Sequence, residues 1–272
     1  MKAEKGGNLS ENNLKERVHR EQVAHTENDV LANSYQLKNR FKHIWTYPSR
    51  KRYDQIMFGF LKDLNGAKVL DYGCGRGDLS LYLLAQGGTV HGIDISPVYI
   101  QDAIQRCASE GYEQSRFQFY VMDCHRMDFP DDFFDMVVGL GILHHLDWII
   151  ALNEIHRVLR PGGRVLLQEP LAGNPLLKIF RKFTPSARTS DERPFTGVDL
   201  KEMKDSFKWR PEMHFCGLLE APVAVVTSII MPNRPNNVIL RTVDWLEKKM
   251  HRAGVLDSWN QYVLINLVKR GG

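Results

Sequence analysis

Between Ala67 and Gln168, short β-rich segments alternate with helical segments, and this alternation limits the fold more than any other feature of the sequence. Ser96 and Pro97 are typical of a helix N-terminus. The helical segments are too short to stand alone, so they must pack on a sheet. Strands that alternate with helices of this length form a mostly parallel sheet covered on both faces. We therefore expect an α/β, Rossmann-like fold, with strands at 68–72, 89–95, 117–122, 134–140 and 164–168.

The segments on either side of this region are predicted to be less regular. Residues 10–45 are expected to be helical and weakly amphipathic, and a second helix is expected to begin at Pro48 with Tyr53, Ile56 and Met57 on its buried face. After Pro170 we predict a late helical insertion and two further strands, which gives seven in all. The predicted segments are a long connection over 171–198, a helix over 199–207, a strand over 213–220, a partly helical stretch over 221–254 and a strand over 261–268.

This pattern predicts two parts: an N-terminal helical lid over 1–64 and a main domain over 65–272. The main domain carries substrate-side insertions at about 171–198 and 221–254. The longest apolar run, 221–231, is shorter than the roughly 20 residues that a membrane span needs. Residues 1–30 show no secretory signal. We therefore expect a cytoplasmic protein without a transmembrane segment.

The cysteines and the net charge exclude several classes of function. Cys74, Cys107, Cys124 and Cys216 are scattered and form no C-x-x-C pair, which argues against a disulfide framework and a thiolate metal site. The formal net charge of +4 is mild, so it does not demand a nucleic-acid partner.

The run VLDYGCGRG at 69–77 is the central motif. Its glycines, Gly73, Gly75 and Gly77, permit a tight turn and let a ligand approach the backbone at a helix N-terminus. Such a turn can also be a mere connection between strand and helix. Asp94 sharpens the functional interpretation, because it ends the next strand, where a carboxylate can accept hydrogen bonds from both ribose hydroxyls.

Asp78 helps to choose between nucleotide ligands. A dinucleotide fingerprint has glycine at this point, beside a pyrophosphate. A negative side chain at the start of the helix is better matched to S-adenosylmethionine, which has an adenosine, a carboxylate and an ammonium group but no phosphate. A nicotinamide-dependent dehydrogenase is the second interpretation.

Four motifs in order resemble those of class I S-adenosylmethionine-dependent methyltransferases. They are VLDYGCGRG at 69–77, HGIDIS at 91–96, which contains Asp94, the acidic Asp123, and NEIHRVLRPGG at 153–163, before the fifth strand. The resemblance covers about 63–168 and is greatest to the small-molecule group that includes quinone-biosynthesis and natural-product enzymes. It implies a seven-stranded Rossmann-like sheet, makes 65–272 the methyltransferase domain, and implies S-adenosylmethionine as cofactor and S-adenosylhomocysteine as product.

The resemblance also implies roles for single residues. Gly73, Gly75 and Gly77, with Cys74 between them, would shape the turn under the methionyl part, while Asp71 would lie near its ammonium and Leu140 would offer a carbonyl. Asp94 would hold the ribose, and Ile95 would pack on the adenine. Asp123 would accept from the adenine amino group, and Cys124 would contribute its backbone N–H. Asp123 could instead cap a turn, and the Cys124 side chain could be only a small apolar filler.

Methyl transfer is an in-line displacement, so the enzyme must align the reactants, exclude water and accept a proton from the acceptor. His144 and His145 follow the fourth strand, beyond which substrates lie in this fold. A neutral imidazole there is a suitable general base. Glu169 could orient a histidine or bind a substrate hydroxyl. We therefore predict His144, His145 and Glu169 as catalytic residues and a hydroxyl oxygen as acceptor, although one histidine could simply cap the next helix.

The acceptor is expected to be a small molecule, hydrophobic or anionic. The basic amphipathic segment 176–183, with Arg188 and Arg193 after it, could hold a carboxylate or phosphate, touch a membrane surface, or be a solvated helix over the pocket. Segment 222–231 could line a hydrophobic pocket or belong to the core. His25, Tyr35 and His43 in the lid could also meet the substrate. Adjacent histidines point apart and no carboxylate triad is evident, so no metal is expected.

Two other functions remain open. A nucleic-acid methyltransferase of the amino-methylating kind would have Asn or Asp, two prolines and an aromatic residue after the fourth strand, where this chain has Gly139-Leu140-Gly141-Ile142. The chain also has no dense basic stripe, so we expect no nucleic-acid partner. A non-catalytic module that binds the cofactor is the other alternative. The sequence leaves the acceptor and the oligomeric state undetermined.

Overall fold

The computed structural model describes residues 11–270 except 28, 206–208, 210 and 253–255. Residues 1–10 of the predicted lid, and the predicted end of the helix at 207, lie outside the described residues. Among the helices that are described, none has both the length and the apolar character that crossing a bilayer requires.

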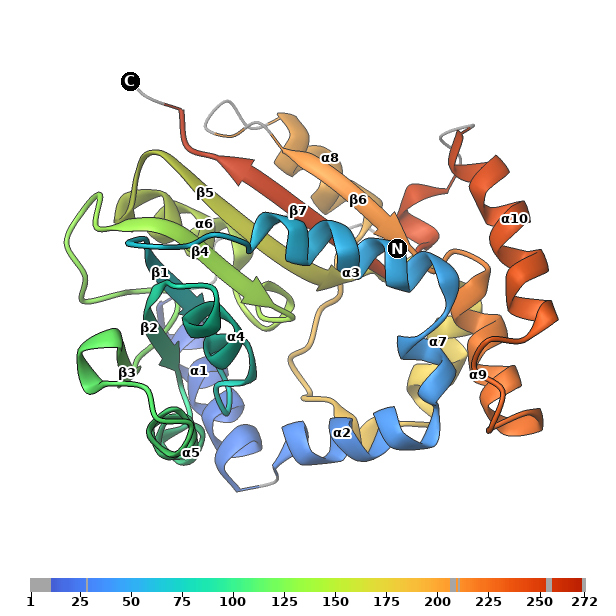
Figure 1. Cartoon of the computed structure of the whole chain (residues 1–272), viewed down its shortest axis with the longest axis horizontal. Coiled ribbons are helices and arrows are strands. Elements are labelled where there is room, and N and C mark those ends of the chain that lie inside the picture. The colour runs from blue at the N-terminus through green and yellow to red at the C-terminus, as the bar shows by residue number, and fades with distance from the viewer. Residues whose placement is uncertain (1–10, 28, 206–208, 210, 253–255, 271–272) are drawn as a thin grey trace.

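One seven-stranded sheet forms the centre of the molecule, with the strand order β3-β2-β1-β4-β5-β7-β6 (Figure 1). The pairs from β3 to β5 are parallel, and β7 runs antiparallel to both of its neighbours. The predicted seven-stranded, mostly parallel Rossmann-like sheet is therefore confirmed. The strands are β1 (Lys68–Tyr72), β2 (Thr89–Asp94), β3 (Phe117–Val121), β4 (Phe134–Leu140), β5 (Leu159–Pro170), β6 (Glu212–Cys216) and β7 (Tyr262–Val268).

Helices cover both faces of this sheet because successive strand residues point to opposite sides. Leu166 belongs to one apolar layer, whereas its neighbours Val165 and Leu167 belong to the other. Figure 1 shows α3 and α4 in front of the sheet and α6 and α8 behind it. The helices of the central part and the following connection are α4 (Asp78–Ala85), α5 (Pro97–Ser109), α6 (Trp148–Val158), α7 (Pro175–Lys182) and α8 (Gly197–Asp205).

The N-terminal segment is divided into shorter helices than the sequence predicts. Helix α1 (Glu11–Thr26) ends before Asp29, which has a left-handed φ of 43°. Asp29 is the N-terminal cap of α2 (Val30–Arg40), and its side chain accepts a hydrogen bond from the N–H of Ala32. This cap redirects the chain, so α1 and α2 lie beyond the carboxyl ends of β1 and β2 (Figure 1). Helix α3 (Pro48–Phe60) begins where predicted, but Ile56, predicted to be buried, is 38% exposed.

Two strand boundaries differ from the prediction by four or more residues, and the others differ by two residues or fewer. Strand β5 begins at Leu159 rather than at 164, because Leu159 pairs with Phe134 before an irregularity in the register. Strand β6 ends at Cys216 rather than at 220. Buried Glu247 in α10 (Val238–Arg252) accepts hydrogen bonds from the N–H groups at 217, 219 and 220, and these bonds cap α9 (Glu220–Ile230).

The junction of α3, α9 and α10 contains a second buried carboxyl group, Glu220. Its Oε2 accepts a hydrogen bond from the N–H of Ser49 at 2.9 Å, and burial raises its pKa from 4.5 to about 7. The folded state therefore holds this proton more tightly than the unfolded chain. The contribution of Glu220 to stability is present in full below about pH 4.5 and declines as the pH rises to about 7.

Glu220→Gln should remove this decline while keeping an acceptor for the Ser49 N–H. The free energy of unfolding of the variant minus that of the unmodified protein should increase by about 1–3 kcal/mol from pH 5 to pH 8. Urea denaturation at the two pH values measures the change. Glu202→Gln, an exposed substitution in α8, is the control and should show no such change. A Glu220→Gln effect independent of pH would contradict the assignment.

Candidate active site

The glycine turn between β1 and α4 uses backbone conformations that side chains disfavour. Gly73, Gly75 and Gly77 have φ values of 76°, 50° and 79°. A Cβ atom at Gly73 would lie 2.7 Å from Cγ1 of Ile142, in the segment after β4. The turn therefore brings bare backbone against the end of β4, and Gly73 and Gly75 form part of a cavity wall there.

Gly77 meets a different requirement. It is the N-cap of α4, and a Cβ atom on it would lie 3.0 Å from the Cβ of Ala103 in α5. Its missing side chain lets the first turn of α4 pack closely on α5, and Gly77 does not line the cavity. The acidic residue that follows, Asp78, accepts hydrogen bonds from Tyr35 and Arg106.

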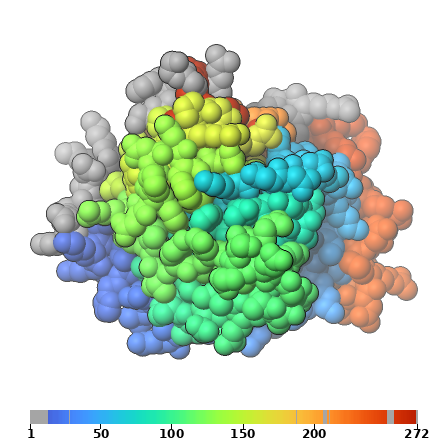
Figure 2. All heavy atoms as spheres, turned by 60° about the vertical axis from the view of Figure 1, so that its left-hand side comes forward, coloured from blue at the N-terminus to red at the C-terminus, as the bar shows by residue number. Residues whose placement is uncertain are grey.

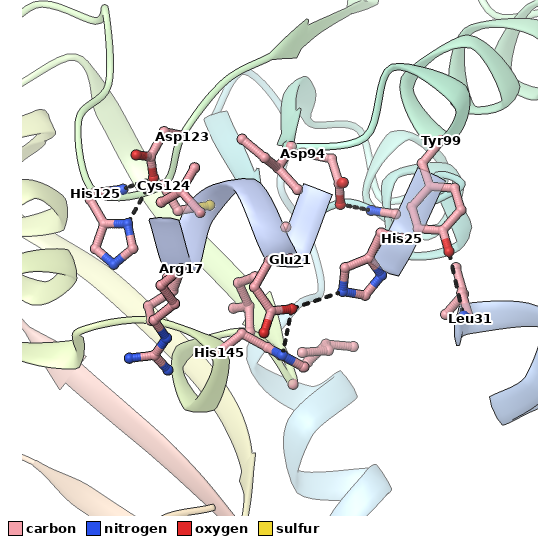
Figure 3. A pocket seen from close by; sticks show the side chains of 18 residues that line it. Arg17, Glu21, His25, Leu31, Asp94, Tyr99, Asp123, Cys124, His125 and His145 are labelled. Carbon is pink, nitrogen blue, oxygen red and sulfur yellow. Dashed lines mark hydrogen bonds and ion pairs between the residues drawn. The ribbon is translucent and has the colours of Figure 1, made fainter. Parts of the chain in front are cut away.

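Asp94 lies at the end of β2, next to the glycine turn. Its Oδ2 accepts a hydrogen bond from the N–H of Gly75 at 3.0 Å, and its Oδ1 accepts one from the N–H of Ser96 at 2.9 Å. Burial raises the pKa of Asp94, and the two N–H groups act against that shift. These bonds fix the carboxylate in a cavity that Ile95 and Tyr99 also line; Figure 3 shows Asp94 and Tyr99.

Asp123 follows β3 and is held by His125. The Asp123 Oδ1 accepts hydrogen bonds from the backbone N–H and the Nδ1 of His125, at 2.9 and 2.8 Å. The N–H of Asp147 donates to Nε2 of the same ring, which places the proton on Nδ1. Although burial acts to raise it, these bonds lower the pKa of Asp123, which therefore offers a charged acceptor to the cavity.

Seven of the ten residues predicted to bind the cofactor line this cavity, whereas Asp71, Cys74 and Gly77 do not. Asp71 is 1% exposed, accepts a hydrogen bond from the Ser80 hydroxyl at 2.5 Å, and has its pKa raised to about 7 by burial. It lies behind the turn rather than at the cavity. The seven lining residues are Gly73, Gly75, Asp94, Ile95, Asp123, Cys124 and Leu140.

Helix α1 covers this cavity. It contributes Arg17, Val18, Glu21 and His25, and Figure 3 shows Glu21 and His25 directed toward His145. In Figure 2 the blue N-terminal residues lie along the lower side of the green part of the chain. Of these four residues, only His25 was predicted from the sequence to meet the substrate. Helix α1 is polar on nearly all sides, so no apolar stripe marks the face that covers the sheet.

Glu21 joins two histidines above the cavity. Its Oε2 lies 3.5 Å from Nε2 of His25 and 3.2 Å from Nδ1 of His145, and Thr189 donates to its Oε1. Although burial acts to raise it, the histidine hydrogen bonds lower the pKa of Glu21. The three ligand atoms lie within 4.8 Å of one another, so a metal ion would fit on distance alone. An ion pair explains the cluster equally well, and the metal-free site stays a prediction.

His144, in the segment after β4, and Glu169, at the end of β5, form a buried pair. Glu169 is fully buried and accepts hydrogen bonds from the N–H groups at 142–144 and, at 2.7 Å, from Nδ1 of His144. The proton of the neutral imidazole is thus on Nδ1, which leaves Nε2 as an acceptor. Burial lowers the pKa of His144 well below its usual value and raises that of Glu169 to about 7.

A second cavity adjoins the first. It has a volume of about 480 Å³ and lies between α2, α3, α7 and the ends of β5 and β7. His144 lines only this second cavity, whereas His145 lines both. The two cavities therefore meet between the end of β4, the segment after it, and helices α1 and α2, at the shared residues His25, Leu31, Leu140, Gly141 and His145.

The other predicted substrate segments have varied positions. In α7, Leu177, Phe180 and Arg181 line the second cavity, while Leu176 and Ile179 on the opposite side are more than half exposed. Segment 222–231 belongs to α9 and lines neither cavity. Tyr35 donates to Asp78, and His43 is buried against Thr227.

Comparison with known proteins agrees with this arrangement. Residues 69–163 match the family described as "Methyltransferase domain". The chain is 29% identical to the demethylmenaquinone methyltransferase of Staphylococcus epidermidis over 211 residues, which are 76% of this chain and 81% of that protein. These matches support a class I S-adenosylmethionine-dependent methyltransferase. The dehydrogenase interpretation is therefore wrong, as the acid at position 78 indicated.

Solved structures show that the fold of this methyltransferase is shared by proteins of several activities. One is the Haemonchus contortus phosphoethanolamine N-methyltransferase 2, with a TM-score of 0.55 and 20% identity over 80% of this chain, which spans about half (53%) of that protein. Another is the [4+2]-cyclase SpnF, with a TM-score of 0.55 and 17% identity over 87% of this chain and 96% of that one. Neither likeness fixes the acceptor of this methyltransferase.

The position of Gly77 predicts a packing cost that a glycine elsewhere does not have. Gly77→Ala would force both a left-handed alanine and a contact with Ala103, whereas Gly111→Ala shares the left-handed φ, 80°, but meets nothing within 4 Å. We expect Gly77→Ala to lower the free energy of unfolding by about 1–3 kcal/mol more than Gly111→Ala. Urea denaturation of both variants measures this, and equal losses would contradict the packing role.

Proposed function

We propose that this methyltransferase transfers a methyl group from S-adenosylmethionine to a hydroxyl oxygen of a small molecule, with His144 as general base. The observation that carries the proposal is the place of His144: buried Glu169 holds its ring, and it lines the second cavity next to His145, which lines both cavities. The name of the Staphylococcus epidermidis relative, which refers to a quinone, supports a small-molecule acceptor.

The first cavity fits the cofactor by the chemistry of its walls. Two carboxylates at the ends of adjacent strands supply acceptors for the ribose hydroxyls, at Asp94, and for the adenine amino group, at Asp123. The bare backbone at Gly73 and Gly75, with the Leu140 carbonyl, would hold the methionyl end. Ile95 and Cys124 would contact the adenine. We further propose that 1–64 acts as a lid on the methyltransferase domain over 65–272, since α1 supplies one cavity wall.

When bound, S-adenosylmethionine supplies a sulfonium methyl group that an oxygen nucleophile can displace. The chain then has three tasks: to align the acceptor, to exclude water and to remove a proton. His144 Nε2, which lies 4.0 Å from Oε1 of Glu192, can accept the hydroxyl proton because Nδ1 donates to Glu169. The Glu169 carboxylate would stabilise the resulting imidazolium, as its four hydrogen bonds hold it in place. His145 would help to position the acceptor at the boundary of the cavities.

A non-catalytic or differently catalytic protein that binds the same cofactor is the second candidate. The likeness to the [4+2]-cyclase SpnF, which covers 96% of that chain, supports this second candidate. Formation of S-adenosylhomocysteine during a screen of hydroxylated small metabolites separates the two candidates. A protein that binds the cofactor but never yields this product with any acceptor would contradict methyl transfer.

Asp94→Ala should weaken the binding of S-adenosylhomocysteine by about 1–3 kcal/mol, because both ribose hydroxyls would lose their acceptor. Isothermal titration calorimetry measures the change. Asp128→Ala, an exposed substitution on the connection after β3, is the control and should leave the affinity unaltered. An affinity unchanged by Asp94→Ala would remove this residue from the proposed role.

His144→Ala should lower kcat by about 10²–10⁴-fold and leave the affinity for S-adenosylhomocysteine nearly intact, because the imidazole acts on the acceptor. The neutral imidazole needs an ionised Glu169 beside it, so kcat should rise with pH through about 7. Glu169→Gln should flatten that rise. The measurement is product formation with the acceptor that the screen identifies.

His214→Ala, on β6, serves as the matched control and should change neither quantity. If His144→Ala reduced cofactor affinity and turnover by the same factor, the histidine would have a structural role instead.

A further inference from the structure

The second cavity contains more positive than negative side chains. Four cationic residues and two carboxylates line it: Lys38, Arg50, Arg181 and Arg188, with Asp54 and Glu192. These residues come from α2, α3, α7 and the connection that follows α7. Charges inside a partly enclosed cavity interact more strongly than charges on an open surface.

Arg50 is the most buried of the four cations and is 7% exposed. Its Nε donates to Asp54 at 2.8 Å, and its Nη2 donates to Gln168 at 3.2 Å. Its Nη1 is buried and has no hydrogen-bond acceptor among the described residues. A guanidinium donor that is buried without an acceptor costs free energy, so this atom is one that a bound anionic oxygen would stabilise.

The two carboxylates of the cavity are already engaged by arginines. Asp54 accepts from Arg50, and Glu192 accepts from Nη1 of Arg188 at 3.1 Å. Over the part of the chain that the structure describes, no carboxylate lies within ion-pairing distance of Lys38 or Arg181. Burial lowers the pKa of both, and the neighbouring Arg50 and Arg188 lower them further. Asp54 and Asp78 act against the shift of Lys38, and Glu192 acts against that of Arg181, but the cations that line the cavity still outnumber its carboxylates.

Aromatic and apolar side chains form the rest of the wall. Trp45, Phe58, Phe180 and Tyr262 line the cavity, and the Arg50 guanidinium lies 5.3 Å from the ring centre of Trp45 and 5.2 Å from that of Tyr262. Such walls bind the flat or apolar body of a ligand and hold the guanidinium plane in position.

We propose that the second cavity is a subsite for acceptors in which an aromatic or apolar body carries a carboxylate or a phosphate, with Arg50 and Arg181 binding the anionic group. This inference rests on the proposed function, because it takes the cavity that His144 lines to be the acceptor site. Gln168, which holds Arg50, directly precedes Glu169, which holds His144. Adjacent residues at the end of β5 thus fix the anion-binding group and the base relative to each other.

The experiment measures binding of three related probes to the full chain saturated with S-adenosylhomocysteine. The probes are 2-naphthoate, 2-naphthyl phosphate and neutral 2-naphthamide, compared by isothermal titration calorimetry. We expect at least one anion to bind tenfold or more tightly than the amide, and the comparison of the two anions identifies the preferred group.

Two variants and a matched control locate the effect. Arg181→Gln and Arg50→Gln should each reduce the preference for the anion at least fivefold. Lys178→Gln, on the same helix as Arg181 but exposed and outside the cavity, should leave the preference unchanged. Arg181 is only partly buried, so its variant keeps the test valid if Arg50→Gln fails to fold.

Equal affinity for the anions and the amide, no binding of any probe, or an equal effect of Lys178→Gln would overturn the subsite. The loading step keeps this result separate from the proposed function. A protein that binds S-adenosylhomocysteine without preferring an anion would lose only the subsite, whereas one that does not bind S-adenosylhomocysteine would lose the proposed function itself.

Discussion

The buried carboxylate of Glu169 is the contact on which the site depends most. Four donors, three of them backbone N–H groups of the segment after β4, converge on its two oxygens. This places the end of β5 and the end of β4 in one rigid unit and fixes the orientation of the His144 ring. Gly141, directly before the residues that Glu169 holds, lines both cavities, so this carboxylate fixes part of the wall that they share.

The remaining walls come from elements that reach the carboxyl edge of the sheet by different routes. The glycine turn and Asp94 are held together by the Gly75 N–H, and His125 holds Asp123 from the next strand. Helix α1 closes the cavity from outside the sheet, through Glu21 and the histidines it contacts. The site therefore combines a rigid base that the parallel sheet dictates with a cover that depends on a few polar contacts.

The sequence predicted the base of the site well and its cover poorly. Strands 68–72 and 134–140 have the predicted limits, because buried parallel strands are continuous apolar runs bounded by turn residues. The contribution of α1 could not be predicted, because its face toward the sheet is polar. Asp71 was expected beside the methionyl end, but a residue's spacing does not reveal that Ser80 binds it. The cations of the second cavity are far apart in the sequence and meet only through the tertiary fold.

The two cavities draw on different parts of the chain. The strand-end residues that would hold the cofactor lie within 69–163, the stretch that matches the methyltransferase family, whereas Lys38, Arg50, Arg181 and Arg188 all lie outside it. Changes in the flanking helices would therefore alter the proposed acceptor subsite and leave the residues proposed to bind the cofactor intact. The same division makes the flanks, rather than the core, the place to redirect this scaffold toward new acceptors.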